Sequence, residues 1–105
     1  MIKYLMQGDY TAEGVKGLLK DGGSAREQAV KKLLASLGGT LDSMYFSPPT
    51  YFIVANLPDP VTAAALAATV FATGAVSPGK SSEILTPTEM DEAAKKHPTY
   101  RAPGI

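Results

Sequence analysis

Tyrosine is the residue type in this sequence best suited to hold a small ligand, because its phenol joins a flat apolar ring to a hydroxyl that donates and accepts hydrogen bonds. Arg26 would add a cation for an anionic ligand, or for a carboxylate such as Asp42. An apolar pocket with a few polar groups would suit a small aromatic or quinone-like molecule. Ordinary core packing of the phenols is the alternative. The candidate ligand-binding residues are Tyr4, Tyr10, Arg26, Tyr45, Tyr51 and Asn56.

Other kinds of chemistry lack the residues they need. The chain has no cysteine, which excludes disulfides, thiol nucleophiles and thiolate metal sites. His97 is the single histidine and lies beside Pro98, so it cannot build a metal site by itself. Gly14 and Gly17 lie within an expected helix and form no phosphate-binding glycine loop. We therefore expect no metal and no cofactor, and the catalytic residues, if any exist, stay unknown.

Composition and charge describe an ordinary small globular protein. The 105 residues fit one domain, and 45% of them are hydrophobic. Lys plus Arg and Asp plus Glu both number 10, without a dense basic run, so we expect no nucleic-acid partner. The longest apolar run, 61–76, is too short to cross a bilayer, and the apolar start of the chain is too short for a signal peptide. The sequence predicts a cytoplasmic protein without a membrane segment.

Four segments have the pattern of strands, with Ser47-Pro48-Pro49-Thr50 as a tight hairpin connection between the middle two. Helices are expected between the strands and after the last one. Ser24 and Glu27 form a capping-box pattern at the start of the second helix, and Asp59-Pro60 gives the third an N-cap followed by proline. The expected strands are Ile2–Gln7, Thr40–Ser47, Tyr51–Leu57 and Lys80–Leu85. The first expected helix follows Thr11 as its N-cap, and the second runs from Ser24 to the Gly38-Gly39 stop. The third covers Val61–Thr73, and the fourth opens with a capping box of Thr86 and Glu89 and ends near Lys96.

The order strand, helix, strand, strand, helix, strand is that of the ferredoxin-like βαββαβ fold. We therefore predict an α+β domain with a four-stranded antiparallel sheet, two helices on one face and an additional C-terminal helix. The domain is expected over residues 1–96, and residues 97–105 are expected to form an extended C-terminal arm.

The strands are apolar on both sides, which favours association. In the third strand, Ile53 and Ala55 alternate with Phe52 and Val54, so whichever set meets the helices, the other leaves apolar side chains uncovered. Pairing two such faces would bury about 800 Å² per subunit, the size of a standard interface. We therefore expect a homodimer or a higher homo-oligomer. The alternative is that the C-terminal helix and arm cover this face within one chain.

Several segments of the chain together form a recognisable pattern. They are Tyr10–Lys20 with Gly22-Gly23, Arg26, Leu37–Leu41, Tyr45-Phe46, Leu57–Asp59, Ala63–Ala67 and Leu85–Glu89. This pattern resembles the GYD-domain proteins, and the similarity extends from about Tyr4 to Ala94. The resemblance implies a ferredoxin-like fold with dimeric α/β-barrel type assembly, which agrees with the oligomer expected from the strands.

The motif that names this family is only partly kept. Tyr51 stands at the tyrosine position, but Pro49 replaces the glycine and Phe52 replaces the aspartate. The resemblance implies the fold more strongly than a reaction. We therefore expect an oligomeric module that binds a small molecule or a partner protein. The alternative is a cofactor-free enzyme of the dimeric α/β-barrel type that acts on a small aromatic or quinone-like compound.

Overall fold

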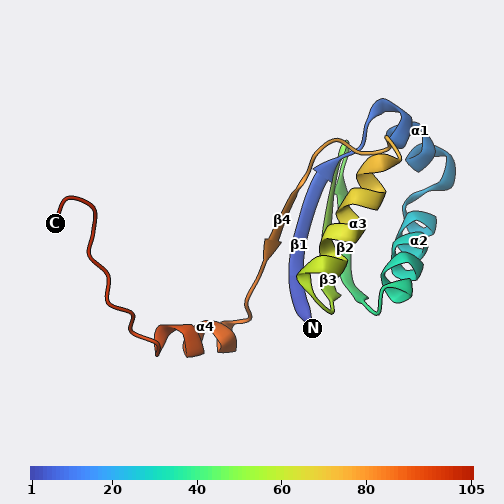
Figure 1. Cartoon of the computed structure of the whole chain (residues 1–105). Helices are drawn as coiled ribbons and strands as arrows, with labels where there is room; N and C mark the ends of the chain where they lie inside the picture. The colour runs from blue at the N-terminus through green and yellow to red at the C-terminus, as the bar shows by residue number, and fades with distance from the viewer.

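The computed structural model describes all 105 residues, and its centre is one antiparallel sheet (Figure 1). The strands are β1 (Ile2–Asp9), β2 (Thr40–Ser47), β3 (Thr50–Leu57) and β4 (Lys80–Glu83). Their order in the sheet is β2-β3-β1-β4. β1 and β3 pair over their full lengths, whereas β4 contributes four residues at one edge. The predicted α+β class and four-stranded antiparallel sheet are confirmed.

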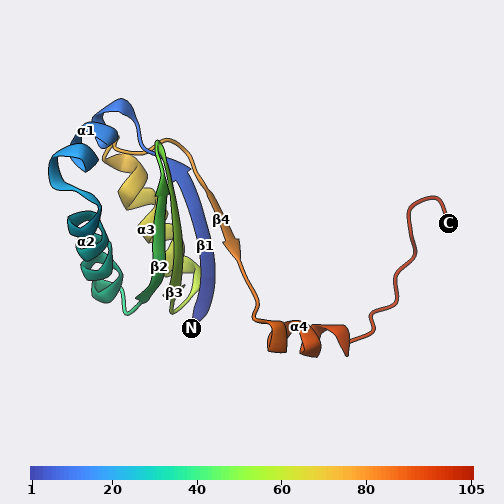
Figure 2. The same ribbon diagram turned by 180° about the vertical axis from the view of Figure 1, so that it is seen from behind.

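Three of the four helices form a layer on one face of the sheet (Figures 1 and 2). They are α1 (Ala12–Asp21), α2 (Gly23–Ser36) and α3 (Pro60–Ala72), and α4 (Pro87–Ala94) follows the last strand. The apolar stripe of α2 and the Ala-rich surface of α3 let both helices approach the sheet. None of the four helices is long and apolar enough to cross a membrane.

Side-chain caps start three helices as predicted. Thr11 accepts a hydrogen bond from Gly14 N–H, Asp59 accepts one from Thr62 N–H, and Thr86 forms a full capping box with Glu89. The capping box predicted at Ser24 is wrong. Gly22 alone makes the break after α1, with a φ of 84° that glycine adopts readily, so α2 begins at Gly23 without a side-chain cap.

The hydrophobic core lies between the sheet and the α2–α3 layer. Leu34 of α2 is 1% exposed, and Ala55 and Leu57 of β3 are fully buried against it. Tyr4 of β1 and Leu66 of α3 complete this cluster. We call the side of the sheet that carries these residues the helix face, and the opposite side, which no helix covers, the open face.

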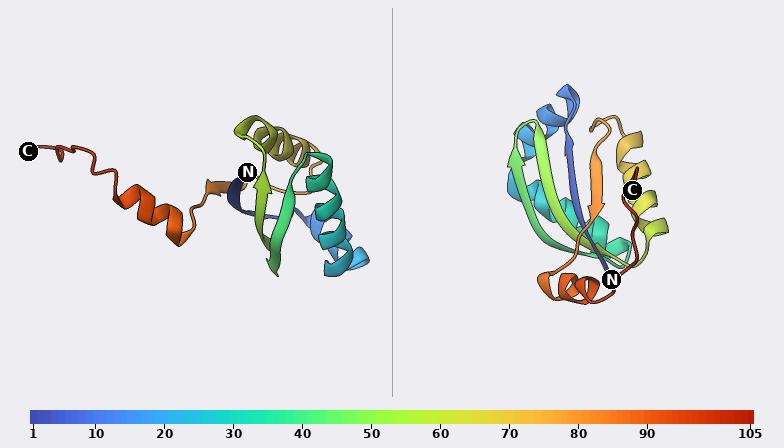
Figure 3. Two further views of the ribbon diagram at one scale, coloured as in Figure 1. Left: turned by 90° about the horizontal axis from the view of Figure 1, so that it is seen from below. Right: turned by 90° about the vertical axis from the view of Figure 1, so that its left-hand side faces the viewer.

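The chain after β4 leaves the body of the domain. α4 and residues 95–105 extend from the side of the sheet opposite the helices (Figures 1 and 3), and residues 85–105 are all exposed. Residues 97–105 contain no helix or strand. The alternative in which this segment covers the open face of its own chain is therefore wrong for this structure.

Candidate ligand cleft

A cleft of about 1040 Å³ opens between α2 and α3, above the helix face. Its floor is made by strand residues and its walls by the two helices, which face one another across it. α1 and the loop after α3 close one end. The apolar lining includes Met6, Met44, Ile53, Val30, Leu33, Ala63, Ala67 and Val70.

Three of the sequence-predicted residues, Tyr10, Arg26 and Tyr51, line this cleft together. The rings of Tyr10 and Tyr51 contact one another with centroids 5.3 Å apart and planes tilted by 53°. The Arg26 guanidinium lies close enough to Tyr10 to act on the pKa of its phenol. Arg26 stands in the first turns of α2, and both tyrosines belong to the end of the β1–β3 pair nearest that helix start. They form one polar corner in an apolar cleft.

Tyr10 is fixed by the backbone around it. Its N–H donates to the Pro49 carbonyl over 2.8 Å, and the residue forms an isolated bridge with Val76. Gly14 faces the Tyr10 ring and the Ala75 carbonyl so closely that a side chain there would collide with the carbonyl. α1 can therefore pack directly against the loop after α3, with Gly14 beside the Tyr10 ring.

Tyr51 is positioned by a glycine on the neighbouring strand. Gly8 pairs with Tyr51 across β1 and β3, and a Cβ at Gly8 would lie 2.7 Å from the phenol oxygen. The ring of Tyr51 thus covers the backbone of Gly8, an arrangement that aromatic side chains favour opposite glycine. Gly8 carries no signal of this role in the sequence, because the role depends on the strand register.

The electrostatics of this corner favour hydrogen-bond donors. Burial raises the pKa of Tyr10, with Arg26 partly opposing the rise, and burial together with Asp9 raises the pKa of Tyr51. Both phenols are therefore protonated at neutral pH. Arg26 is half-buried, and its guanidinium makes no hydrogen bond or ion pair in the structure, whereas Glu13, also at the cleft, pairs with Lys16. The unpartnered donors of Arg26 would suit an anionic group.

The other three predicted residues do not join this corner. Tyr4 is 8% exposed and belongs to the core cluster, so ordinary core packing, the alternative to ligand binding, describes it. Tyr45 is 68% exposed on the open face, and Asn56 lies on that same face. Tyr4, Tyr45 and Tyr51 do not gather in one place, because Tyr45 and Tyr51 point to opposite sides of the sheet.

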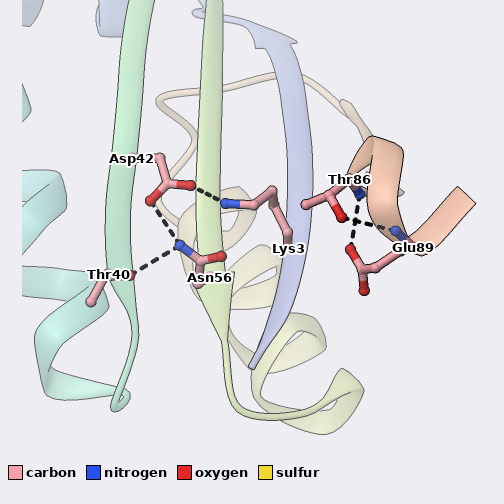
Figure 4. A network of polar contacts seen from close by, with 6 residues as sticks. All are labelled: Lys3, Thr40, Asp42, Asn56, Thr86 and Glu89. Carbon is pink, nitrogen blue, oxygen red and sulfur yellow. Dashed lines mark hydrogen bonds and ion pairs between the residues drawn. The ribbon is translucent and has the colours of Figure 1, made fainter. Parts of the chain in front are cut away.

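Asn56 belongs to a polar network on the open face (Figure 4). Its side-chain N–H₂ group donates to Asp42 over 2.9 Å and to Thr40 over 3.1 Å, and Lys3 donates to the other oxygen of Asp42. The hydrogen bond from Lys3 holds the pKa of Asp42 below its ordinary value, and the bond from Asn56 adds to this. The suggested pairing of Arg26 with Asp42 is therefore wrong.

The family comparison agrees with this fold. The model of the GYD domain matches residues 4–94 of the 105. The chain belongs to the GYD domain family. A search of curated proteins found no match.

In this GYD domain the residues at the motif positions separate between the two faces. Tyr51 points to the cleft, whereas Phe52, which replaces the aspartate of the motif, lies on the open face between Gln7 and Tyr45. Neighbouring strand residues point to opposite sides, so one short motif serves both surfaces.

The structure contains no group of three or more His, Asp or Glu side chains that could hold a metal ion.

Proposed function

We propose that this GYD domain binds a small aromatic molecule carrying an anionic oxygen group, in the cleft between α2 and α3. The observation that carries the proposal is Arg26, half-buried and without a partner, beside two phenols at the end of an apolar cleft. A partly buried guanidinium loses hydrogen bonds to water. A carboxylate or similar anion replaces them best, because it accepts hydrogen bonds from two N–H groups of the guanidinium at once.

The remaining surface of the cleft supports an aromatic body for this ligand. Methionine sulfurs and aliphatic side chains line the floor and walls, and Tyr10 and Tyr51 offer ring edges and faces for stacking. Because both phenols are protonated, they would donate hydrogen bonds to the ligand and would be poor general bases. The enzymatic alternative would have to use them as donors to an oxyanion.

The proposal is tested by ligand-induced shifts in melting temperature with three matched probes. We expect 4-hydroxybenzoate to raise the melting temperature, cyclohexanecarboxylate to raise it less, and 4-hydroxybenzamide to leave it unchanged. A ligand at a hundred times its dissociation constant adds about 2.7 kcal/mol to the free energy of unfolding. If the neutral amide shifts the temperature as much as the acid does, or if no probe does so, the proposal fails.

Arg26→Met provides the matching variant. We expect it to abolish the shift with 4-hydroxybenzoate. Arg101→Met, in the exposed C-terminal arm, is the control, because it removes the same charge far from the cleft. A retained shift in Arg26→Met would contradict the assigned role of the guanidinium.

We further propose that two copies pair through their open faces. Leu5, Phe52 and Val54 lie side by side there with Tyr45, and no layer of their own chain covers them. Tyr45 is 68% exposed, so its ring is available to a second copy of the chain. An apolar patch of this kind on a sheet face is typical of a protein–protein contact.

Sedimentation equilibrium tests this pairing. We expect a dimer at micromolar concentration, and we expect Tyr45→Lys to shift it to monomer, because two opposed cations would enter the interface. Leu19→Lys, at a leucine 79% exposed on α1, introduces the same charge away from the open face. A wild-type protein that sediments as a monomer throughout would refute the pairing.

A further inference from the structure

α4 is a formed helix that packs against nothing in its own chain. Each of its residues is exposed, and so are all residues from Leu85 to the end of the chain. Only its start stays near the body, where Ile84 N–H donates to the Lys3 carbonyl over 2.9 Å. The hydrogen bonds between Glu89 and Thr86 lower the pKa of the Glu89 carboxyl most, and the positive charge of Lys3 lowers it further (Figure 4).

An isolated helix of this length is unstable in water. Helices shorter than about 12 residues are marginal even when rich in alanine, since nucleation costs more than a few backbone bonds return. α4 has eight residues, and its capping box alone offsets little of that cost. A packed apolar side is the usual source of the missing stability. Met90, 56% exposed, with Ala93 and Ala94 at helical spacing, forms such an unused side.

The direction of the segment indicates what would cover it. It extends outward on the open-face side, so that a body seated on the open face would lie beside it (Figure 3). The longest dimension of the whole molecule, domain body and segment together, is 55 Å, against 32 Å and 23 Å for the others. Two packed sheets lie about 10 Å apart, so a segment that leaves on the open-face side would run alongside a second body seated on that face.

We propose that residues 84–105 form an exchanged arm, in which α4 packs its Met90 side on a second copy of this chain. The inference rests on the pairing of open faces proposed above. In a two-fold dimer each copy would give one arm and receive one, so the arm adds two symmetric contacts to the paired sheets.

Hydrogen exchange of the full chain tests the arm, at concentrations above and below the dissociation constant measured by sedimentation. We expect the amides of α4 to exchange at least about tenfold more slowly above that constant than below it. Protection that persists in the monomer would show that α4 is stable on its own chain and would overturn the inference. A dimer with unprotected α4 would also overturn the arm while leaving the paired sheets intact. A monomer at every concentration would overturn both.

A pair of arm variants locates the contact. Met90→Asp should raise the dissociation constant of the dimer about tenfold or more, because it places a charge in the apolar contact. Thr88→Asp is the control, since it adds the same charge to the same helix on the opposite side. Equal dissociation constants for Met90→Asp and wild type would refute the assigned side of α4.

Discussion

The two faces of the sheet differ in how their side chains are covered. On the helix face, Leu34 and Leu57 are closed over by α2 and the sheet, and a cleft with polar groups at one end remains beside them. On the open face, Phe52 and Val54 are only half-covered and sit beside a network of Lys3, Asp42 and Asn56. The helix layer thus buries the core of the single chain, whereas the open face is the surface that we propose for association.

This difference shows that alternation along a strand assigns separate roles to adjacent residues. Tyr51 contributes a phenol to the cleft, and Phe52, the next residue, contributes a ring to the opposite surface. A substitution on one face should therefore affect the stability of the monomer or the binding of a ligand, and one on the other face should affect association.

The largest expected effect is on the helix face. Leu34→Ala removes a side chain that is 1% exposed, and it should lower the free energy of unfolding by about 3 kcal/mol, at any protein concentration. Urea denaturation measures this. Leu19→Ala, at a leucine 79% exposed on α1, should change it by less than about 0.5 kcal/mol. Similar losses in both variants would mean that the core is not where we place it.

On the open face, Val54→Thr replaces a methyl group with a hydroxyl of the same shape. The monomer should remain folded, because Val54 is only half-buried. The loss of apolar burial at two symmetric sites, about 1 kcal/mol each, should raise the dissociation constant of the dimer about tenfold or more. Sedimentation measures it, with Val61→Thr, 80% exposed on α3, as the control. An unchanged constant would place Val54 outside the interface.

Gly8→Ala tests whether ligand binding depends on the position of the Tyr51 ring on the helix face. The added methyl group would meet the Tyr51 hydroxyl and displace the ring, so the dissociation constant for 4-hydroxybenzoate should rise by about tenfold. Calorimetric titration measures the affinity. Gly17→Ala is the control, because its methyl group would meet no atom within 4 Å. If Gly8→Ala binds as tightly as wild type does, Tyr51 takes no part in recognition.

The smallest effect concerns the polar network. The pKa of Asp42 is lowered in the folded chain, so its contribution to stability is complete above the ordinary aspartate pKa of about 3.9 and is lost as the pH falls below it. In Asp42→Asn, the free energy of unfolding should fall less on acidification than it does in the wild type. The difference should be less than about 1 kcal/mol, because both partners of the ion pair are partly exposed. Urea denaturation as a function of pH measures the change. A steeper acid-side loss in the variant would reverse the assigned sign.

Much of this fold could be predicted because its signals are local. Thr11, Asp59 and Thr86 are caps whose side chains act within three residues, and all three were identified from the sequence. Ser24 misled the prediction because Gly22 had already turned the chain, so that the helix began before the expected cap. The resemblance to the GYD family was likewise carried by residues along most of the chain.

The order of the elements, the alternation of the strands and the apolar side chains on both faces follow from the amino-acid sequence, because each depends on residues near one another in the chain. Which tyrosines meet depends instead on how distant segments pack. Tyr10, Arg26 and Tyr51 lie on three different segments, and Gly8 supports Tyr51 through a register that links distant strands. The direction of α4 was decided in the same way, since a segment that contacts nothing in its own chain carries no local signal of where it points.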